Sequence, residues 1–209
     1  MNGQEALEVT SLSAQNGDSD AGRSSGDETS APEGTDTALI LSTEAEDDLD
    51  SQAMIAAYLD GIEVLRRAVA GMTPEQLVAR PVAGRWSTLE VVCHLADFEP
   101  IYADRMKRVI ATDRPLMLSA GHEAFARSLT YHGRDIDEEL ALIEATRKQM
   151  ARILRNVHQD AWERVGIYRH EGQEEERSLR RLLEMITGHI PHHAAFIAQK
   201  RRALGVEPA

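Results

Sequence analysis

Four stretches of this chain carry apolar residues at alternating three- and four-residue steps, and this repeat limits the folds that it can adopt. The stretches begin near residue 45, at residue 87, near residue 135 and at residue 178. Such spacing places apolar side chains on one face of an α-helix. The sequence between the stretches has little of the alternation that is typical of strands. Four amphipathic helices of about 20 to 26 residues predict an all-α fold, a four-helix bundle.

Capping residues support the expected helix boundaries. Ser87 and Glu90 are spaced as the N-cap and N3 residues of a capping box, which starts the second helix. The carboxylate of Asp135 or of Asp137 suits the start of the third helix, and Ser178 suits the start of the fourth. These signals place each helix start next to its apolar repeat.

The two longer connections have different compositions. Residues 113–134 are irregular, with a short helix expected around 123–129. Residues 160–177 are polar and acidic and contain two glycines, so we expect a loop or a short hairpin there. Neither connection has the length or apolar content of a separate domain.

Charge is distributed very unevenly along the chain. The first fifty residues hold 13 of the 35 acidic residues and a single basic one, Arg23. The whole net charge of −12 therefore belongs to this segment, and the rest of the chain is balanced. We predict a disordered acidic tail over 1–44, the bundle domain over 45–205 and a C-terminal tail over 206–209. A neutral domain gives no electrostatic reason to expect nucleic acid or a membrane surface as a partner.

Because the sequence shows no targeting signal and has a single cysteine, we expect a cytoplasmic protein. No apolar run is long enough for a transmembrane helix, and the N-terminus lacks the regions of a secretory signal. Cys93 is the single cysteine, so no internal disulfide can form. We interpret Cys93 as a small core residue, with a thiolate ligand as the alternative.

Three histidines fall on faces that should point into the bundle. His189 and His193 lie four residues apart on the apolar repeat of the last helix, and His94 lies on that of the second. His192 lies about 100° away around the helix and should face elsewhere. Each inward imidazole could bond a nearby polar group, as core histidines usually do. Alternatively the three could share a divalent metal ion and leave one coordination position open, as in catalytic zinc sites.

Pro191 stands between the two histidines of the last helix. A proline inside a helix removes one backbone hydrogen bond, here to the carbonyl of Thr187, and costs about 3 kcal/mol. A helix break at this point would spoil the spacing of His189 and His193. The apolar repeat continues in phase beyond the proline, so we predict a continuous helix with a kink.

The chain resembles the DinB-like superfamily of four-helix-bundle, metal-dependent enzymes. The resemblance rests on the segment 85–87, Arg-Trp-Ser, on His94-Leu-Ala-Asp-Phe-Glu in the second helix, and on His189-x-x-x-His193 in the last. It spans about residues 50–205. It implies that His94, His189 and His193 are the metal ligands and that the divalent ion is zinc or nickel.

The resemblance also implies a class of activity. Some relatives are transferases or isomerases that use low-molecular-weight thiols, so we expect a small-molecule substrate and either thiol transfer or hydrolysis. The alternative is a non-catalytic bundle that binds a partner or serves in stress, with a structural metal or none. Helical bundles often form homodimers, and the sequence leaves the oligomeric state of this one open.

Two further residues are candidates for roles at the site. Asp97 lies one turn beyond His94 and could act as a general base or orient an imidazole, or it could be a carboxylate at the helix edge. Arg105 lies on the same inward repeat and could bind an anionic group or extend to solvent.

Overall fold

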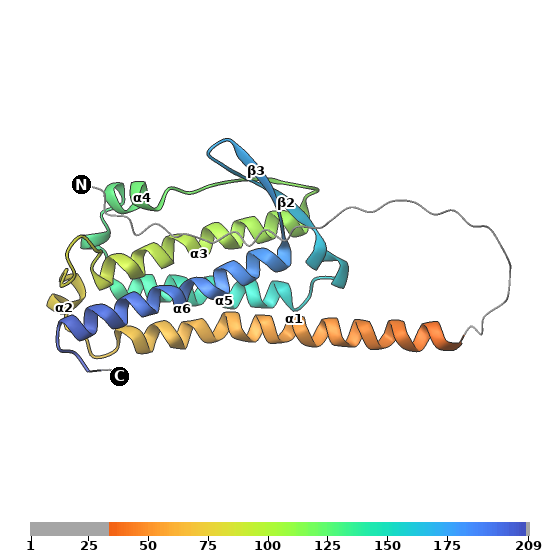
Figure 1. The fold of residues 1–209 in the computed structure, drawn as a ribbon, viewed down its shortest axis with the longest axis horizontal. Helices are drawn as coiled ribbons and strands as arrows, with labels where there is room; N and C mark the ends of the chain where they lie inside the picture. The colour runs from red at the N-terminus through yellow and green to blue at the C-terminus, as the bar shows by residue number, and fades with distance from the viewer. Residues whose placement is uncertain (1–33, 208–209) are drawn as a thin grey trace, which may run out of the picture.

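The four long helices pack lengthwise into a bundle, as the apolar repeats predict (Figure 1). The computed structural model describes residues 34–207, with side chains from residue 49 onward. The long helices are α1 (Gly34–Val69), α3 (Thr88–Ala111), α5 (Ile136–Leu154) and α6 (Leu179–Ala203). Each contacts two neighbours, in the order α1, α6, α3, α5 around the bundle. The helices that carry the three histidines, α3 and α6, are therefore adjacent.

The predicted starts of α3, α5 and α6 are confirmed. Ser87 and Glu90 form a complete capping box before α3, because each side chain accepts a hydrogen bond from the other residue's backbone N–H. Asp135 is the N-cap of α5, and Ser178 is the N-cap of α6. A second capping box, at Thr73, begins the short helix α2 (Pro74–Val78).

Helix α1 begins earlier than the sequence indicated. Its first residue is Gly34, whereas the sequence predicted a start near residue 45. Residues 35–48 contain no proline or glycine, the residues that disfavour a helix interior most strongly. The predicted disordered tail otherwise lies outside the described residues.

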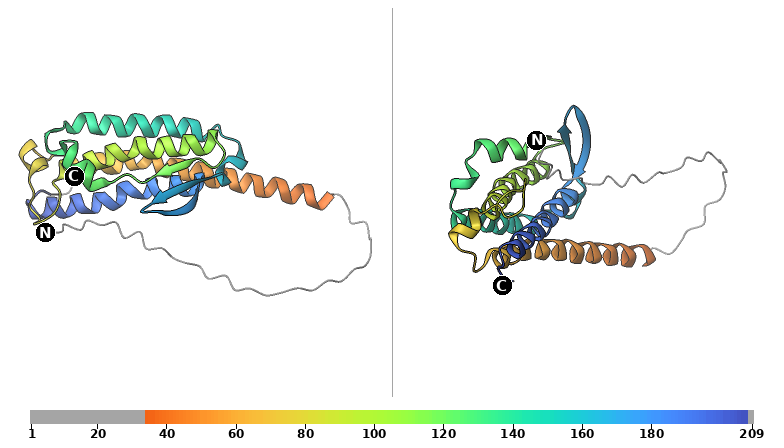
Figure 2. Two further views of the ribbon diagram at one scale, coloured as in Figure 1. Left: turned by 90° about the horizontal axis from the view of Figure 1, so that it is seen from above. Right: turned by 60° about the vertical axis from the view of Figure 1, so that its left-hand side comes forward.

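Helices α3 and α5 run in the same direction, opposite to α1 and α6 (Figures 1 and 2). The connection between α3 and α5 must therefore return along the outside of the bundle. It carries β1 (Leu116–Leu118), the predicted short helix α4 (His122–Ser128) and the 3-10 turn η1 (Tyr131–Gly133). This return brings α4 back to the end of the bundle where α3 begins.

The polar connection before α6 forms a hairpin. The sequence predicted either a loop or a short hairpin there. After the 3-10 turn η2 (Gln159–Glu163), β2 (Val165–His170) pairs antiparallel with β3 (Gln173–Ser178). Both turn residues, Glu171 and Gly172, have positive φ, as a tight two-residue hairpin requires. The parallel pairing of β1 with β2 was not predicted, because three residues are too few to show a strand pattern.

Two helices contain a proline and continue through it. Helix α6 is unbroken from Leu179 to Ala203 with Pro191 inside, so the prediction of a continuous helix is confirmed. Pro100 lies within α3 in the same way, and the sequence gave no expectation for it. Within the part of the chain that the structure describes, no helix is long and apolar enough to cross a membrane.

A buried ion pair joins all four long helices at the centre of the bundle. Arg147 of α5 donates to the carboxylate of Glu99 of α3, and both side chains are fully buried. Arg147 also donates to the backbone carbonyls of Tyr58 in α1, at 2.5 Å, and of Ile186 in α6, at 3.0 Å. The hydroxyl of Tyr58 donates to Glu99 at 3.1 Å. We call this group the Arg147 network. The two main apolar clusters of the core each include residues from the same four helices.

Candidate metal centre

His94 lies in the second turn of α3 on the face that meets α6. Its side chain is buried, with 1% of the residue exposed. Apolar residues flank it on the same helix, including Val91 and Leu95, which are fully buried. The apolar repeat that forms α3 therefore also fixes the direction in which this imidazole points.

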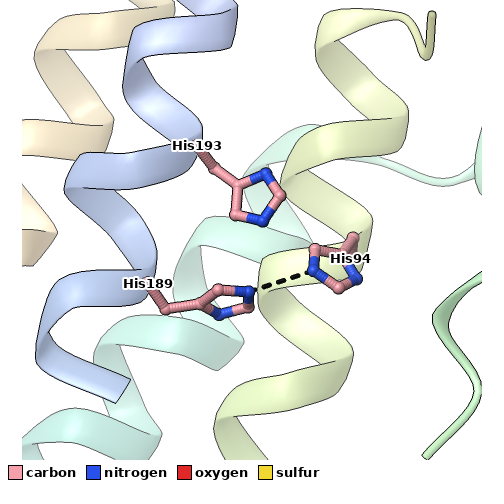
Figure 3. A group of neighbouring side chains, drawn as sticks. All are labelled: His94, His189 and His193. Atoms are coloured by element: carbon pink, nitrogen blue, oxygen red, sulfur yellow. Dashed lines mark hydrogen bonds between the residues drawn. The ribbon is translucent and has the colours of Figure 1, made fainter. Parts of the chain in front are cut away.

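His189 and His193 extend from α6 toward His94 (Figure 3). The Nε2 atoms of His94 and His189 are 3.0 Å apart. The ring centroid of His193 lies 4.8 Å from that of His94 and 4.7 Å from that of His189. One nitrogen from each of the three side chains lies within 4.8 Å of the other two. We call these residues the histidine triad.

Most nitrogens of the histidine triad lack a hydrogen-bond partner among the described residues. The buried atoms without one are Nδ1 of His94, Nδ1 of His189 and both nitrogens of His193. A buried polar group without a partner costs about 1–3 kcal/mol, so the arrangement is unfavourable by itself. Buried polar atoms in native proteins are nearly always satisfied, which points to a group that completes this site.

Burial keeps all three imidazoles neutral. It is the largest cause that lowers the pKa of His94 to about 2, followed by the neighbouring His189 and His193. It likewise lowers the pKa of His193 to about 2. The pKa of His189 falls to about 3 through burial first and the positive charge of Arg147 second. A neutral imidazole offers a lone pair to a metal ion, whereas a protonated one does not.

This donor set fits a divalent metal ion. Imidazole nitrogens bind zinc at about 2.0–2.1 Å, which in a tetrahedral site sets nitrogens roughly 3.3 Å apart. The separations in the histidine triad bracket that value, from 3.0 Å to at most 4.8 Å. Imidazole is also a good ligand for nickel.

Aromatic side chains surround the histidine triad on the side of the returning connection. The ring of Phe98 lies 4.5 Å from that of His94, and the ring of Trp86 lies 5.4 Å from it. His122, at the start of α4, has its ring 6.2 Å from His94. The sequence pattern had not singled out His122, because only the return of the chain along the bundle brings α4 to this site.

Asp97, the residue predicted to act in catalysis, forms an ion pair with Arg134. Its Oδ1 accepts from Arg134 at 2.9 Å, and Arg134 also binds both carboxylate oxygens of Glu139. No described contact joins Asp97 to the three histidines. The structure thus offers no support for Asp97 as a general base, and that role stays a prediction.

Two other residues near the triad lie as the sequence indicated. His192 is exposed, so it points away from the interior as expected. Cys93 is fully buried, and its thiol donates to the carbonyl of Tyr131 at 3.4 Å. Burial raises the pKa of the Cys93 thiol to about 12, which suits a core residue and not a thiolate ligand.

A cleft of about 420 Å³ opens beside the triad. Phe98 and His122 line it and also contact His94 through their rings. The rest of the cleft is formed by α3, by residues 119–122 and by the β2–β3 hairpin. Its volume lies in the range of sites that bind small molecules.

Comparisons with known proteins agree on one family. A family model described as the DinB superfamily matches residues 57–197, more than half of the chain. A protein from Geobacillus thermodenitrificans named "putative metal-dependent hydrolase" is 29% identical over 156 residues, which cover 75% of this chain and 86% of that protein. A protein of the same description from Bacillus subtilis, YfiT, is 28% identical over 141 residues, covering 68% of this chain and 78% of that protein.

The fold also matches a solved structure. The structure of YfiT from Bacillus subtilis is described as a probable metal-dependent hydrolase with an unusual four-helix bundle topology. It superimposes with a TM-score of 0.69 at 24% identity, over 75% of this chain and 89% of that one. At this identity the superposition shows the fold alone. Because the family model covers most of the bundle, this chain belongs to the DinB superfamily.

Proposed function

We propose that this protein is a metal-dependent hydrolase whose divalent ion is held by His94, His189 and His193. One observation carries the proposal: one nitrogen from each of three imidazoles, on two adjacent helices, lies within 4.8 Å of the other two in the bundle interior. A divalent ion would complete such a site, because it would accept the lone pair of one nitrogen from each neutral imidazole. The relatives described above are named as metal-dependent hydrolases, which supports the same class of reaction.

The three ligands come from rigid elements. His189 and His193 lie one turn apart on α6, and His94 is fixed on α3 by the apolar packing around it. Three protein ligands would leave one coordination position for water or substrate, as in catalytic zinc sites. A divalent ion at such a site supplies a Lewis acid that lowers the pKa of water and polarises a substrate carbonyl. We expect zinc or nickel, since imidazole suits both.

The surrounding residues shape the environment of the reaction. Phe98 and Trp86 cover His94 with aromatic rings and limit the access of bulk water. Arg147 lies behind His189 and helps to keep that imidazole neutral, as a ligand must be. Thiol-dependent transfer is the second expectation for this site, and the resemblance to thiol-dependent relatives is its sole support.

Metal analysis of untagged protein tests the proposal. After supplementation with zinc or nickel and removal of excess ion, we expect about one ion per chain. His193→Ala should lower the content severely, since it removes one of the three proposed ligands. His192→Ala is the matched control, because His192 is exposed on the same turn of α6 and should leave the content unchanged.

Activity separates the enzyme from a non-catalytic bundle. The loaded protein should hydrolyse members of a panel of small esters and amides, and a chelator should abolish the activity. Full metal content with no turnover across the panel would favour a structural metal. Low metal content that is equal in the unaltered protein and in His193→Ala would overturn the proposed site.

A further inference from the structure

The cleft beside the histidine triad has a charged residue at its far end. Arg105 lines the cleft, and only 4% of the residue is exposed. Its Nη2 donates to the carbonyl of Leu118 at 2.6 Å. No carboxylate among the described residues lies within ion-pair distance of it, whereas the fully buried Arg147 is paired with Glu99. Arg105 is thus a buried cation without a counter-charge in the described part of the chain.

Aromatic rings hold the guanidinium toward the cleft. The carbon atom Cζ of Arg105 lies 4.9 Å from the ring centroid of Tyr102 and 5.2 Å from that of Tyr168. Arg105 also lines a second depression, of about 560 Å³, but both tyrosines line only the first cleft. Burial lowers the pKa of Arg105 from its ordinary value, as expected for a cation removed from water without an anion.

The remaining charges of the cleft are already compensated. Arg177 pairs with Glu175, and its guanidinium stacks over the ring of Tyr168 at 3.5 Å. Glu174 accepts from Arg169, with Nε at 2.7 Å. These pairs add no net charge, and the carboxylates of Glu174 and Glu175 disfavour a ligand with more than one negative charge. A single unpaired guanidinium therefore suits a monoanion better than a phosphate dianion.

Helix α3 carries both Arg105 and His94, with Phe98 of the cleft between them. His94, Phe98, Tyr102 and Arg105 succeed each other at steps of four, four and three residues on α3, so they lie near one face. Arg105 follows His94 by eleven positions, which corresponds to roughly 16 Å along the helix axis. The side chain of Arg105 leans toward the N-terminus of α3, and thus toward His94, because helical side chains point that way. A molecule of ordinary substrate size can span the remaining distance between the guanidinium of Arg105 and the histidine triad.

We propose that this cleft binds substrates with one carboxylate group, which Arg105 anchors while the scissile bond reaches the histidine triad. The proposal rests on the hydrolase function proposed above and adds the class of substrate. The planar guanidinium can bind a carboxylate through two hydrogen bonds. Phe98, Tyr102 and Tyr168 form an apolar or aromatic wall, so the substrate carries an apolar or aromatic portion between its carboxylate and its reacting group.

A titration of the metal-free full chain tests this anchor separately from the metal. The probes are 3-phenylpropanoate and its neutral amide, followed by chemical-shift changes in ¹H–¹⁵N spectra of protein treated with a chelator. We expect the acid to bind at least about tenfold more tightly than the amide, with shifts concentrated at Arg105 and residues 119–122. Inorganic phosphate should bind more weakly than the acid.

Substitutions at Arg105 test whether this residue causes the preference for the acid. Arg105→Met should abolish the preference for the acid, and Arg105→Lys should retain part of it, because lysine keeps the charge but loses the planar fork. Arg108→Gln is the matched control, because Arg108 is exposed and pairs with Asp104. Arg108 lines the second depression and not the cleft, so the preference for the acid over the amide should persist. If Arg105→Met does not fold, two other results test whether Arg105 binds the carboxylate. They are the affinities of Arg105→Lys and the comparison of acid and amide on the unaltered chain.

The outcomes keep the two proposals distinct. Equal affinity for acid and amide, or a preference unchanged in Arg105→Met, would overturn the anchor even where the metal content is full. Tighter binding of phosphate would overturn the choice of a monoanion. In His193→Ala the preference for the acid should remain, since the metal-free cleft is intact there. Low metal content with a retained preference would count against the hydrolase and leave the anchor standing.

Discussion

Two polar clusters lie buried between the same helices, and they differ in how many of their polar atoms have partners. In the Arg147 network, the guanidinium binds Glu99 and two backbone carbonyls, and Tyr58 also donates to Glu99. In the histidine triad, four nitrogens have no partner among the described residues. The first cluster joins four helices, whereas the second joins only α3 and α6.

The difference separates a structural role from a ligand-binding role. A buried ion pair whose hydrogen bonds are satisfied holds its surroundings in one arrangement. A buried cluster without partners destabilises the metal-free fold and is useful only if something binds it. The two clusters also interact, because the charge of Arg147 helps to lower the pKa of His189.

The largest expected effect is the acid sensitivity of the metal-free triad. The unfolded histidines take up protons near pH 6.5, whereas burial lowers the pKa in the folded chain to about 2 or 3. Above pH 6.5 neither state binds the protons. Below it the unfolded state does, so stability falls by up to about 4 kcal/mol per pH unit for three histidines. Urea unfolding between pH 7 and pH 5 measures this slope.

A variant of the triad sharpens that measurement. His193→Leu should reduce the slope by about a third, since it removes one of three titrating groups. His158→Leu, at an exposed position far along the chain from the triad, should leave the slope unchanged. A flat profile of the unaltered chain between pH 7 and pH 5 would contradict the buried, neutral state of the histidines.

Next in size is the effect of breaking the Arg147 network. Arg147→Met leaves Glu99 buried without its cation and should destabilise the chain by about 3–5 kcal/mol in urea unfolding. The double variant with Glu99→Leu should recover much of this loss, because no unpaired charge remains. Lys148→Met, at the exposed neighbouring position, should change little. A small effect of Arg147→Met would mean that the two clusters do not differ as described.

A smaller effect should follow from filling the space that Arg147 occupies. A Cβ atom at Gly61 would lie 2.2 Å from Nη1 of Arg147, so Gly61→Ala must displace the guanidinium. We expect a loss of about 1–3 kcal/mol. Gly188→Ala is the matched control on α6, where a Cβ meets nothing within 4 Å, and it should stabilise by about 0.5–1 kcal/mol. Equal effects of the two substitutions would contradict the close packing at Gly61.

The smallest expected effect concerns Cys93, next to His94 in sequence. Its thiol is buried and its pKa is raised to about 12, so it should stay protonated and inert at pH 8. A thiol reagent should modify it only after urea unfolds the chain, and zinc should not alter this. Fast modification of the native, metal-free protein would mean that Cys93 faces the site.

The fold and the histidine triad could be predicted because both follow from the repeat along single helices. His94, His189 and His193 lie on apolar stripes, and the stripes of a bundle face inward. The capping residues Ser87 and Ser178 act within one turn of sequence, so they too could be identified.

The remaining features depend on contacts between segments that are distant in the sequence. His122 reaches the site only because the connection after α3 turns back along the bundle. Arg147 lies between Ile143 and Met150 on the inward-facing stripe of α5. A charged residue at a core position could therefore be recognised from the sequence. Its partner, Glu99, could not be identified without the packing of α5 against α3.

X-ray absorption spectroscopy of the zinc-loaded, untagged chain tests the central claim most directly, because it counts the ligands of the ion. We predict three imidazole nitrogens at about 2.0–2.1 Å and at least one further light atom. His193→Ala should remove one imidazole from the spectrum, and His192→Ala should leave it unchanged. A sulfur ligand, or a zinc ion with fewer than two imidazoles in the unaltered protein, would contradict a metal centre at the histidine triad.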